Sequence, residues 1–272
     1  MRVPPVVLSV AGYDPSSGAG ITADIKTAAS LGCYAVTCIT ALTVQSTQGV
    51  FGVQPLPPEL VVRTLEALAD DVEIAAVRLG MLGSGAVAAA VAGFLRSRRL
   101  PNVVLDPVIR SSSGAALLDE AGVEVLRTKL ILLCDVMTPN IDEAAVLVGA
   151  EPIAGGASWD LALPSLREIA AGLHRLGANA AVITGGHLQS ANDYLSYKVA
   201  SDENQEEIIL GERLESRSPH GTGCAFATAL ACRLALGDKL PEAIHAAKDY
   251  VRKGILSAYP LGKGIGPVNH FG

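Results

Sequence analysis

Short apolar runs alternate with longer helical segments along this sequence, and this alternation constrains the fold more than any other feature. The runs are apolar on consecutive positions and lie at residues 6–10, 35–40, 74–79, 103–106, 130–137 and 181–184. Helical patterns fill residues 20–31, 58–70, 85–99, 121–129, 142–149 and 163–176. Because strands that are apolar on both faces must be covered on both sides, the order predicts a mostly parallel sheet in a three-layer α/β/α fold.

The pattern changes after residue 186. Residues 193–199 and 207–210 predict an antiparallel hairpin at the sheet edge, and residues 221–236 and 241–258 predict two further helices. No linker-like segment and no internal repeat divides the chain. We therefore predict a single domain over residues 1–272.

The composition excludes several classes of protein. Half of the residues are apolar and 18% are charged, whereas disorder needs the opposite balance. The net charge is −6 without any tract of Lys and Arg, which argues against a nucleic-acid partner. Residues 27–58 are uncharged, but glycines and prolines interrupt them, so they predict no membrane span. Five cysteines in no metal-binding spacing and an N-terminus without a signal-peptide pattern indicate reduced thiols and a cytoplasmic location.

Ligands of open α/β sheets bind at the carboxyl ends of the strands, which locates the candidate loops before any motif is considered. The segments that follow the predicted strands are residues 12–20, 43–47, 80–83, 106–114, 138–143 and 184–187. They are rich in Gly, Ser, Thr and Asn, a composition that ordinary loops share.

The strongest motif is the segment SPHGTGCAF at residues 218–226, which opens the predicted helix. Gly221 and Gly223 allow the backbone to turn so that N–H groups point at one anion, and the helix dipole adds positive potential. Cys224 lies in the same field, which predicts a lowered thiol pKa beside an anion hole. The alternative is an ordinary glycine-containing helix start with a buried cysteine, and the spacing alone does not separate the two.

A second glycine-rich loop, AGYDPSSGAG at residues 11–20, leads into a helix that carries Asp24 and Lys26. The loop matches neither the dinucleotide-binding nor the Walker pattern. Asp24 can accept hydrogen bonds from a substrate, although an acidic residue near a helix start is also favoured by the dipole alone.

Asn140 and Glu143 are three residues apart and share a face of a predicted helix. An amide oxygen and a carboxylate, acting through water, suit Mg²⁺ held between protein and phosphates. The same pattern is that of a capped helix start, and both interpretations can hold together. With Asp106 at an earlier strand end and the anion hole, these residues indicate phosphoryl transfer.

The C-terminal residues 262–270, GKGIGPVNH, are so rich in glycine that we expect a flexible tail, and His270 suggests no metal role.

At these motifs the sequence resembles the hydroxymethylpyrimidine/phosphomethylpyrimidine kinases, the thiamine-biosynthesis members of the ribokinase-like superfamily. The matching segments run in order through residues 11–27, 39–47, 78–84, 103–108, 138–144, 185–187, 220–224 and 263–271. HGTGC at residues 220–224 discriminates best, because ribokinase, adenosine kinase and most pyridoxal kinases carry Asp after the GTG.

The resemblance implies a homodimeric kinase that uses ATP and Mg²⁺. It would phosphorylate the alcohol of 4-amino-5-hydroxymethyl-2-methylpyrimidine and then add a second phosphate to give the diphosphate. By this resemblance Cys224 is the catalytic residue, and Gly221, Thr222 and Gly223 form the anion hole. The implied pyrimidine pocket consists of Gly12, Asp24, Gln45, Met81 and Val108. The implied nucleotide and Mg²⁺ side consists of Asp106, Asn140, Glu143, Thr184 and Lys248, with Asn140 and Glu143 reaching the metal through water.

Two positions depart from the family pattern. Many members have a lysine at the position of Thr184, where it meets a phosphate, so the second phosphorylation is in question. Tyr13 stands where a small polar residue is usual and can narrow the pocket. Two alternatives stay open: a pyridoxine or pyridoxal kinase of the same subgroup, and a pyrimidine-binding sensor without catalysis.

Overall fold

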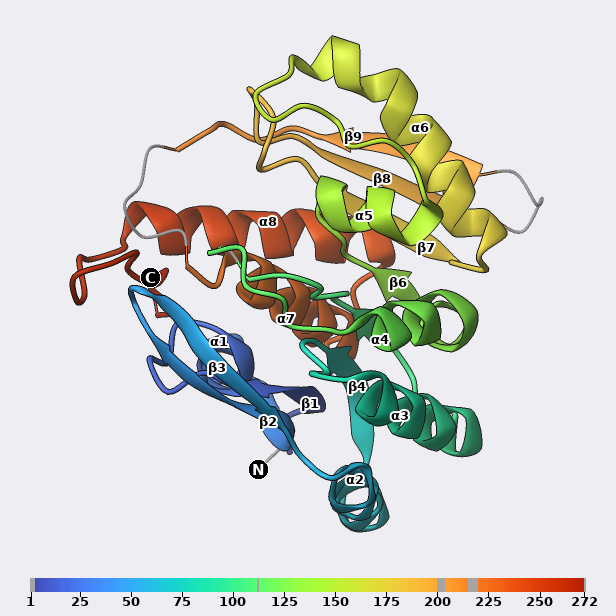
Figure 1. The fold of residues 1–272 in the computed structure, drawn as a ribbon, viewed down its shortest axis with the longest axis vertical. Coiled ribbons are helices and arrows are strands. Elements are labelled where there is room, and N and C mark those ends of the chain that lie inside the picture. Colours follow the sequence, from blue (N-terminus) through green and yellow to red (C-terminus); the bar gives the residue numbers. More distant parts are fainter. Residues whose placement is uncertain (1–2, 112, 200–203, 215–219, 272) are drawn as a thin grey trace.

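The computed structural model describes residues 3–111, 113–199, 204–214 and 220–271 (Figure 1). In this part of the chain, nine strands form one sheet in the order β3-β2-β1-β4-β5-β6-β7-β8-β9. Neighbouring strands from β2 to β7 are parallel, whereas β3, β8 and β9 pair antiparallel. The strands are β1 (Val6–Tyr13), β2 (Tyr34–Ser46), β3 (Gly49–Pro55), β4 (Ile74–Leu79), β5 (Val103–Leu105), β6 (Val136–Met137), β7 (Ala180–Thr184), β8 (Asp193–Lys198) and β9 (Asn204–Ile209).

Helices cover both faces of the sheet, which confirms the predicted α/β/α layers (Figure 1). They are α1 (Gly20–Ser30), α2 (Pro58–Asp71), α3 (Gly85–Arg98), α4 (Glu120–Val125), α5 (Ile141–Val148), α6 (Trp159–Arg175), α7 (Thr222–Ala235) and α8 (Leu240–Leu256). One hydrophobic core joins the sheet to α2, α3, α5 and α6, and the second joins the other face to α1, α7 and α8.

The two cores explain why the central strands carry apolar residues at consecutive positions. In β5, Val103 and Leu105 pack into the first core, whereas Val104 between them packs into the second. Successive side chains of a strand point to opposite faces, so each face of β5 needs its own apolar residue. Because these strands pair in parallel, the carboxyl ends of β1, β4, β5, β6 and β7 lie at one edge of the sheet.

Two sequence predictions need correction. The apolar run at 130–137 is not one strand, because Leu126–Leu130 and Ile131–Leu133 continue α4 as short π and 3-10 turns and only Val136–Met137 is extended. A short apolar run does not distinguish a buried helix turn from a strand. Residues 43–46 are not a loop either, since β2 continues to Ser46 and pairs with β3, and only Thr47 of this segment lies in the turn.

The predicted hairpin after residue 186 is confirmed as β8 and β9, which pair from Asp193 with Ile209 to Lys198 with Asn204. None of the helices in the described residues combines the length and apolar character that a membrane crossing requires.

Candidate active site

A cavity of about 240 Å³ opens at the edge of the sheet where the parallel strands end. Twelve of the residues proposed from the sequence line it: Gly12, Gln45, Met81, Asp106, Val108, Asn140, Glu143, Thr184, Gly221, Thr222, Gly223 and Cys224. Asp24 and Lys248 do not line it. Residues 218 and 219 of the SPHGTGCAF motif lie outside the described residues.

The start of α7 lies against the loop that precedes α1. Gly221 has a φ of +84°, and a Cβ at this position would lie 1.8 Å from the carbonyl oxygen of Gly18. Gly221 is therefore required both for its left-handed backbone and for this close approach. The contact brings Cys224, in the first turn of α7, to the cavity wall. The first N–H groups of a helix have no partner within it, so this wall can receive an anion.

The environment of the Cys224 thiol differs from the sequence prediction. Burial of the thiol raises its pKa to about 11, although the charge of Arg78 and a hydrogen bond from the Gly20 backbone act in the opposite direction. The carboxylates of Asp106 and Asp24 raise it further. The predicted lowering by the helix dipole is therefore wrong, because desolvation of the thiolate outweighs it. Cys224 carries its proton at neutral pH.

Arg78 forms the centre of a buried charge cluster beneath the cavity. Its side chain is fully buried, and Nη2 donates to Asp106 Oδ2 at 2.6 Å while Nη1 lies 3.4 Å from Asp24 Oδ2. Asp24 also accepts hydrogen bonds from Ser9 at 2.5 Å and Thr228 at 2.7 Å. The expectation that Asp24 contacts a substrate needs correction, because its carboxylate is enclosed and already bonded. The sequence held one signal for this cluster, a single arginine inside the buried run 74–79.

Asn140 and Glu143 form a complete capping box at the start of α5. The side chain of Asn140 accepts from Glu143 N at 2.9 Å, and Glu143 Oε2 accepts from Asn140 N at 3.0 Å. The other oxygen of Glu143 accepts from Ile109 N at 3.4 Å. Burial raises the pKa of Glu143, and the nearby charge of Asp106 raises it further. The interpretation of this pair as a capped helix start is therefore confirmed. Both residues also line the cavity.

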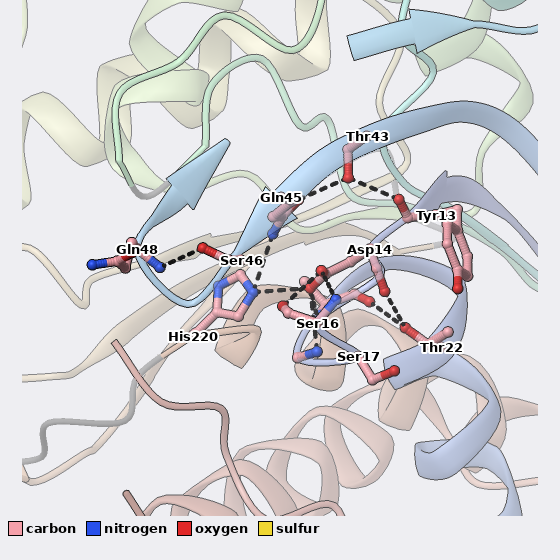
Figure 2. Close-up of polar contacts among 12 residues, drawn as sticks. Tyr13, Asp14, Ser16, Ser17, Thr22, Thr43, Gln45, Ser46, Gln48 and His220 are labelled. Atoms are coloured by element: carbon pink, nitrogen blue, oxygen red, sulfur yellow. Dashed lines mark hydrogen bonds and ion pairs between the residues drawn. The ribbon is translucent and has the colours of Figure 1, made fainter. Parts of the chain in front are cut away.

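In the cavity wall, His220 lies between Asp14 and Gln45 (Figure 2). The Nε2 atom of His220 lies 3.0 Å from Asp14 Oδ2 and 3.3 Å from Gln45 Nε2. Asp14 and His220 also line the cavity, although the sequence analysis gave neither a role. Their separation along the chain hides the contact, and the only signal was that each belongs to a glycine-rich motif.

Of the two residues proposed for the nucleotide side, Thr184 lines the cavity and Lys248 does not. Thr184 ends β7 and lines the cavity. Lys248 instead donates from Nζ to Asp193 at 2.5 Å and to the Ala191 carbonyl at 2.6 Å. Asp193 in turn accepts from the backbone N–H of Gly185 at 3.0 Å. The lysine therefore supports the turn that follows Thr184 and does not reach the cavity itself.

The C-terminal segment is bound to the rest of the site rather than loose. Ile265 N donates to the carbonyl of Thr47 at 2.8 Å, and Ile265 lines the cavity. His220 N donates to Gly266 O, and Val268 N donates to His220 O, both at 3.2 Å. The expectation of a flexible tail is wrong, because backbone hydrogen bonds to two distant loops hold it.

A ligand cavity at the carboxyl edge of a parallel sheet, beside a helix start and buried carboxylates, fits an α/β phosphotransferase. A family model described as phosphomethylpyrimidine kinase matches residues 14–269, and the chain belongs to this family.

Three individual proteins illustrate the relationship. The chain is 42% identical over 267 residues to the hydroxymethylpyrimidine/phosphomethylpyrimidine kinase of Streptomyces coelicolor, covering 98% of this chain and 94% of that protein. It is 43% identical over 264 residues to the thiamine biosynthesis bifunctional protein ThiED of Geobacter sulfurreducens, covering 97% of this chain but only 52% of that longer protein. The pyridoxal kinase of Bacillus subtilis, solved as an ADP complex, superposes with a TM-score of 0.85 at 31% identity, covering 98% and 97% of the two chains.

Proposed function

We propose that this chain transfers the γ-phosphate of ATP to the alcohol of 4-amino-5-hydroxymethyl-2-methylpyrimidine and then to the resulting monophosphate. The observation that carries the proposal is the location of Cys224 at the start of α7 in the wall of a cavity at the sheet edge. Membership of the phosphomethylpyrimidine kinase family supports the choice of substrate.

The reaction forms a bond between the alcohol oxygen and phosphorus, breaks the bond between that phosphorus and the leaving ADP oxygen, and releases the alcohol proton to solvent. In this proposal the backbone N–H groups of Gly221, Thr222 and Gly223 receive the negative charge of the transferred phosphoryl group. Cys224, protonated at neutral pH, hydrogen-bonds the alcohol and orients it toward the phosphorus. Positioning and charge neutralisation account for most catalysis in this class of reaction.

The ring-binding part of the cavity is proposed to consist of Gly12, Gln45, Met81 and Val108. The support for this set is that all four residues line the cavity. Gly12 packs directly on Met81, where a Cβ on the glycine would lie 2.8 Å from the methionine sulfur. A wall of mostly apolar groups with one polar side chain suits a flat nitrogen-containing ring. Gln45 supplies the polar group that distinguishes a nitrogen-containing ring from a hydrocarbon ring.

We propose that Asp106, Asn140 and Glu143 bind Mg²⁺ through water. The chemistry of the donors fits, because burial and then the charge of Asp106 raise the pKa of Glu143, and a cation bound nearby would relieve that repulsion. Each oxygen of Glu143 accepts one backbone N–H and retains a lone pair for a metal-bound water. Among the described residues no group of three or more His, Cys, Asp or Glu forms a full protein cage for a metal. Mg²⁺ supplies neutralising charge for the phosphates.

Product analysis by mass spectrometry tests the proposal. The protein is incubated with Mg-ATP and the pyrimidine alcohol, and we expect the monophosphate first and the diphosphate later. A Cys224→Ala variant should bind ATP normally and lose most turnover. Absence of any phosphate transfer to the alcohol contradicts the proposed function, and full activity of the variant removes Cys224 from the mechanism.

Pyridoxal kinase activity is the second candidate, and the similarity to the B. subtilis pyridoxal kinase favours it. Parallel assays with pyridoxal and with the pyrimidine alcohol separate the candidates by their kcat/KM values. A catalytically inactive pyrimidine sensor is the third candidate. Binding of the pyrimidine in calorimetry without turnover of ATP would identify it.

We also propose that two copies of the chain associate in the cytoplasm. Support comes from three large apolar side chains on the β2–β3 hairpin, Leu42, Val44 and Phe51, which are 44%, 67% and 68% exposed. Sedimentation velocity of the wild type and of a Phe51→Asp variant tests the association. A wild type that sediments as a single chain at micromolar concentration contradicts it.

A further inference from the structure

The imidazole of His220 faces two groups that make opposite demands on one nitrogen. Nε2 lies 3.0 Å from a carboxylate oxygen of Asp14, which can only accept, and 3.3 Å from the amide nitrogen of Gln45, which can only donate. A ring nitrogen carries either a proton or a lone pair in its plane, so it cannot serve both neighbours. One of the two contacts must change, and the surroundings of Asp14 decide which.

Asp14 is held in its ionised form by a nest of donors. Its Oδ1 accepts from Ser16 N at 2.8 Å, and its Oδ2 accepts from Ala19 N at 2.9 Å and Gly18 N at 3.2 Å. Burial raises the pKa of Asp14, but hydrogen bonds from His220 and Ser16 outweigh burial and leave the pKa below its ordinary value. At 3.0 Å a lone pair on Nε2 of His220 would repel this charged oxygen, and therefore Nε2 carries a proton.

The remaining conflict disappears when the Gln45 amide is rotated by a half turn. The oxygen and nitrogen of an amide have the same shape, so hydrogen bonding assigns them. After rotation, Gln45 Oε1 accepts from His220. Gln45 Nε2 then takes the place 3.1 Å from Thr43 Oγ1 and donates to that oxygen. Thr43 Oγ1 can accept this bond because its own proton goes to the carbonyl of Tyr13 at 2.9 Å. The single Nε2–H of His220 is then shared between Asp14 Oδ2 and Gln45 Oε1, and one of the two Gln45 N–H groups is bonded to Thr43. Figure 2 shows these side chains with the amide drawn before the rotation.

The backbone fixes His220 firmly enough to impose this order. The ring fits over Gly18, where a Cβ would lie 2.3 Å from His220 Cδ2. The His220 backbone is bonded on both sides to the C-terminal segment, through Gly266 O and Val268 N. We call the hydrogen-bonded series from Asp14 through His220 and Gln45 to Thr43 the relay. It joins three parts of the chain that are distant in sequence.

We infer that His220, held by Asp14, is a positioning residue that fixes the Gln45 amide and directs its second N–H into the cavity. The site then selects a ring edge whose nitrogen accepts a hydrogen bond and disfavours a C–H at the same place. This inference rests on the proposed function, since it names the feature of the ring that the same cavity recognises. It adds a determinant of specificity that does not touch the reacting atoms.

The protonation state of His220 can be measured without any ligand. In protein labelled with ¹⁵N in its histidines, the His220 ring signals are assigned by their loss in a His220→Gln variant. We expect a proton on Nε2 at neutral pH, either in the neutral tautomer or in the imidazolium. A neutral ring protonated on Nδ1 alone overturns the relay.

Kinetics test the consequence for specificity. The substrates are the pyrimidine alcohol and a pyridine analogue in which C–H replaces the accepting ring nitrogen. The wild type should prefer the pyrimidine, and His220→Ala should raise KM for the pyrimidine and reduce this preference by roughly tenfold, with a smaller effect on kcat. His220→Gln, whose amide N–H can reach the position of Nε2, should restore most of the preference.

The matched control is His245→Ala, which removes an exposed histidine paired with Glu207 at 2.7 Å on the surface. It should leave the preference unchanged. If His220→Ala folds, is active and discriminates as the wild type does, the inference is wrong. If the wild type phosphorylates neither compound, the proposed function fails instead, and the nitrogen spectrum still decides the state of the relay.

Discussion

Arg78 donates to Asp106 across 2.6 Å in a place where the guanidinium has no contact with solvent. Asp24 lies on its other side, so one buried cation serves two carboxylates. We predict that Arg78→Met lowers the free energy of unfolding by about 3–5 kcal/mol, because removing one partner leaves buried charge without compensation. Urea unfolding of the purified variant measures the change.

An exposed ion pair provides the control for this prediction. Arg98 lies 2.8 Å from Asp70, with side chains that are 39% and 64% exposed. Arg98→Met should change the free energy of unfolding by less than about 1 kcal/mol, since solvent screens such pairs. Equal effects of the two substitutions would show that the Arg78 cluster contributes no more than a surface pair.

Gly80 makes room for the same guanidinium. A Cβ on Gly80 would lie 1.7 Å from Arg78 Nη1, so Gly80→Ala must displace the arginine from its carboxylates. We expect a loss of about 1–3 kcal/mol in unfolding free energy. Gly93→Ala in α3 is the control, because nothing lies within 4 Å of its Cβ and alanine favours a helix. Equal melting temperatures of the two variants would contradict the prediction.

Local patterns predicted the strands well but not the contacts between distant segments. The consecutive apolar residues at 103–106 predicted a strand, and both faces of β5 are indeed buried. Such a run can be recognised without knowing which strands and helices pack against it. The role of Arg78 could not be predicted, because its partners Asp24 and Asp106 lie far away in the sequence. The sequence also predicted that Asp24 contacts a substrate, because it indicated a position near the sheet edge. It did not indicate that Arg78, Ser9 and Thr228 enclose the carboxylate.

The site was predicted best where a motif and the cavity coincide, as at Gly221 and Cys224, which line it. The chemical state of Cys224 was predicted wrongly, because the helix dipole is a local property and desolvation depends on the whole fold. The β2–β3 hairpin was missed because Ser46 and Gly49 resemble ordinary loop residues, and the pairing forms beyond the main cores.

Alkylation of Cys224 tests its raised pKa. The thiolate is the reacting species, so at neutral pH iodoacetamide should modify Cys224 more slowly than an ordinary cysteine. The rate should increase by about tenfold per pH unit and level off only near the pKa of about 11. The other four cysteines are buried, and peptide mapping with a Cys224→Ser control assigns the modified residue. A rate that is already at its plateau at pH 7 would contradict the raised pKa.

His270 makes stability depend on pH. Burial, followed by the charge of Lys26, lowers the pKa of this histidine to about 4, while its Nδ1 atom lies 3.2 Å from Thr27 Oγ1. Between about pH 6.5 and 4 the unfolded chain binds a proton that the folded chain resists, so stability falls as pH falls through this window. The loss amounts to at most about 3 kcal/mol.

A His270→Gln variant, which does not titrate, checks this dependence. Its unfolding free energy should change less between pH 6.5 and 4 than that of the wild type, as measured by urea unfolding at each pH. His245→Gln, at an exposed position, should keep the wild-type dependence. Parallel curves for the wild type and His270→Gln would mean that His270 does not titrate differently in the folded state.

Thr184 lines the cavity at the end of β7, at the position where the family resemblance implies a lysine in many members. The monophosphate brings negative charge to the site before the second transfer, and a cation at residue 184 would attract it. We therefore expect Thr184→Lys to increase the rate of the second phosphorylation relative to the first by roughly threefold to tenfold, the value of a partly exposed ion pair. Thr184→Met, which has similar length but no charge, should leave this ratio close to that of the wild type. Time courses of monophosphate and diphosphate formation give both rates from one reaction. An equal ratio in the lysine and methionine variants would mean that charge at residue 184 does not limit the second transfer.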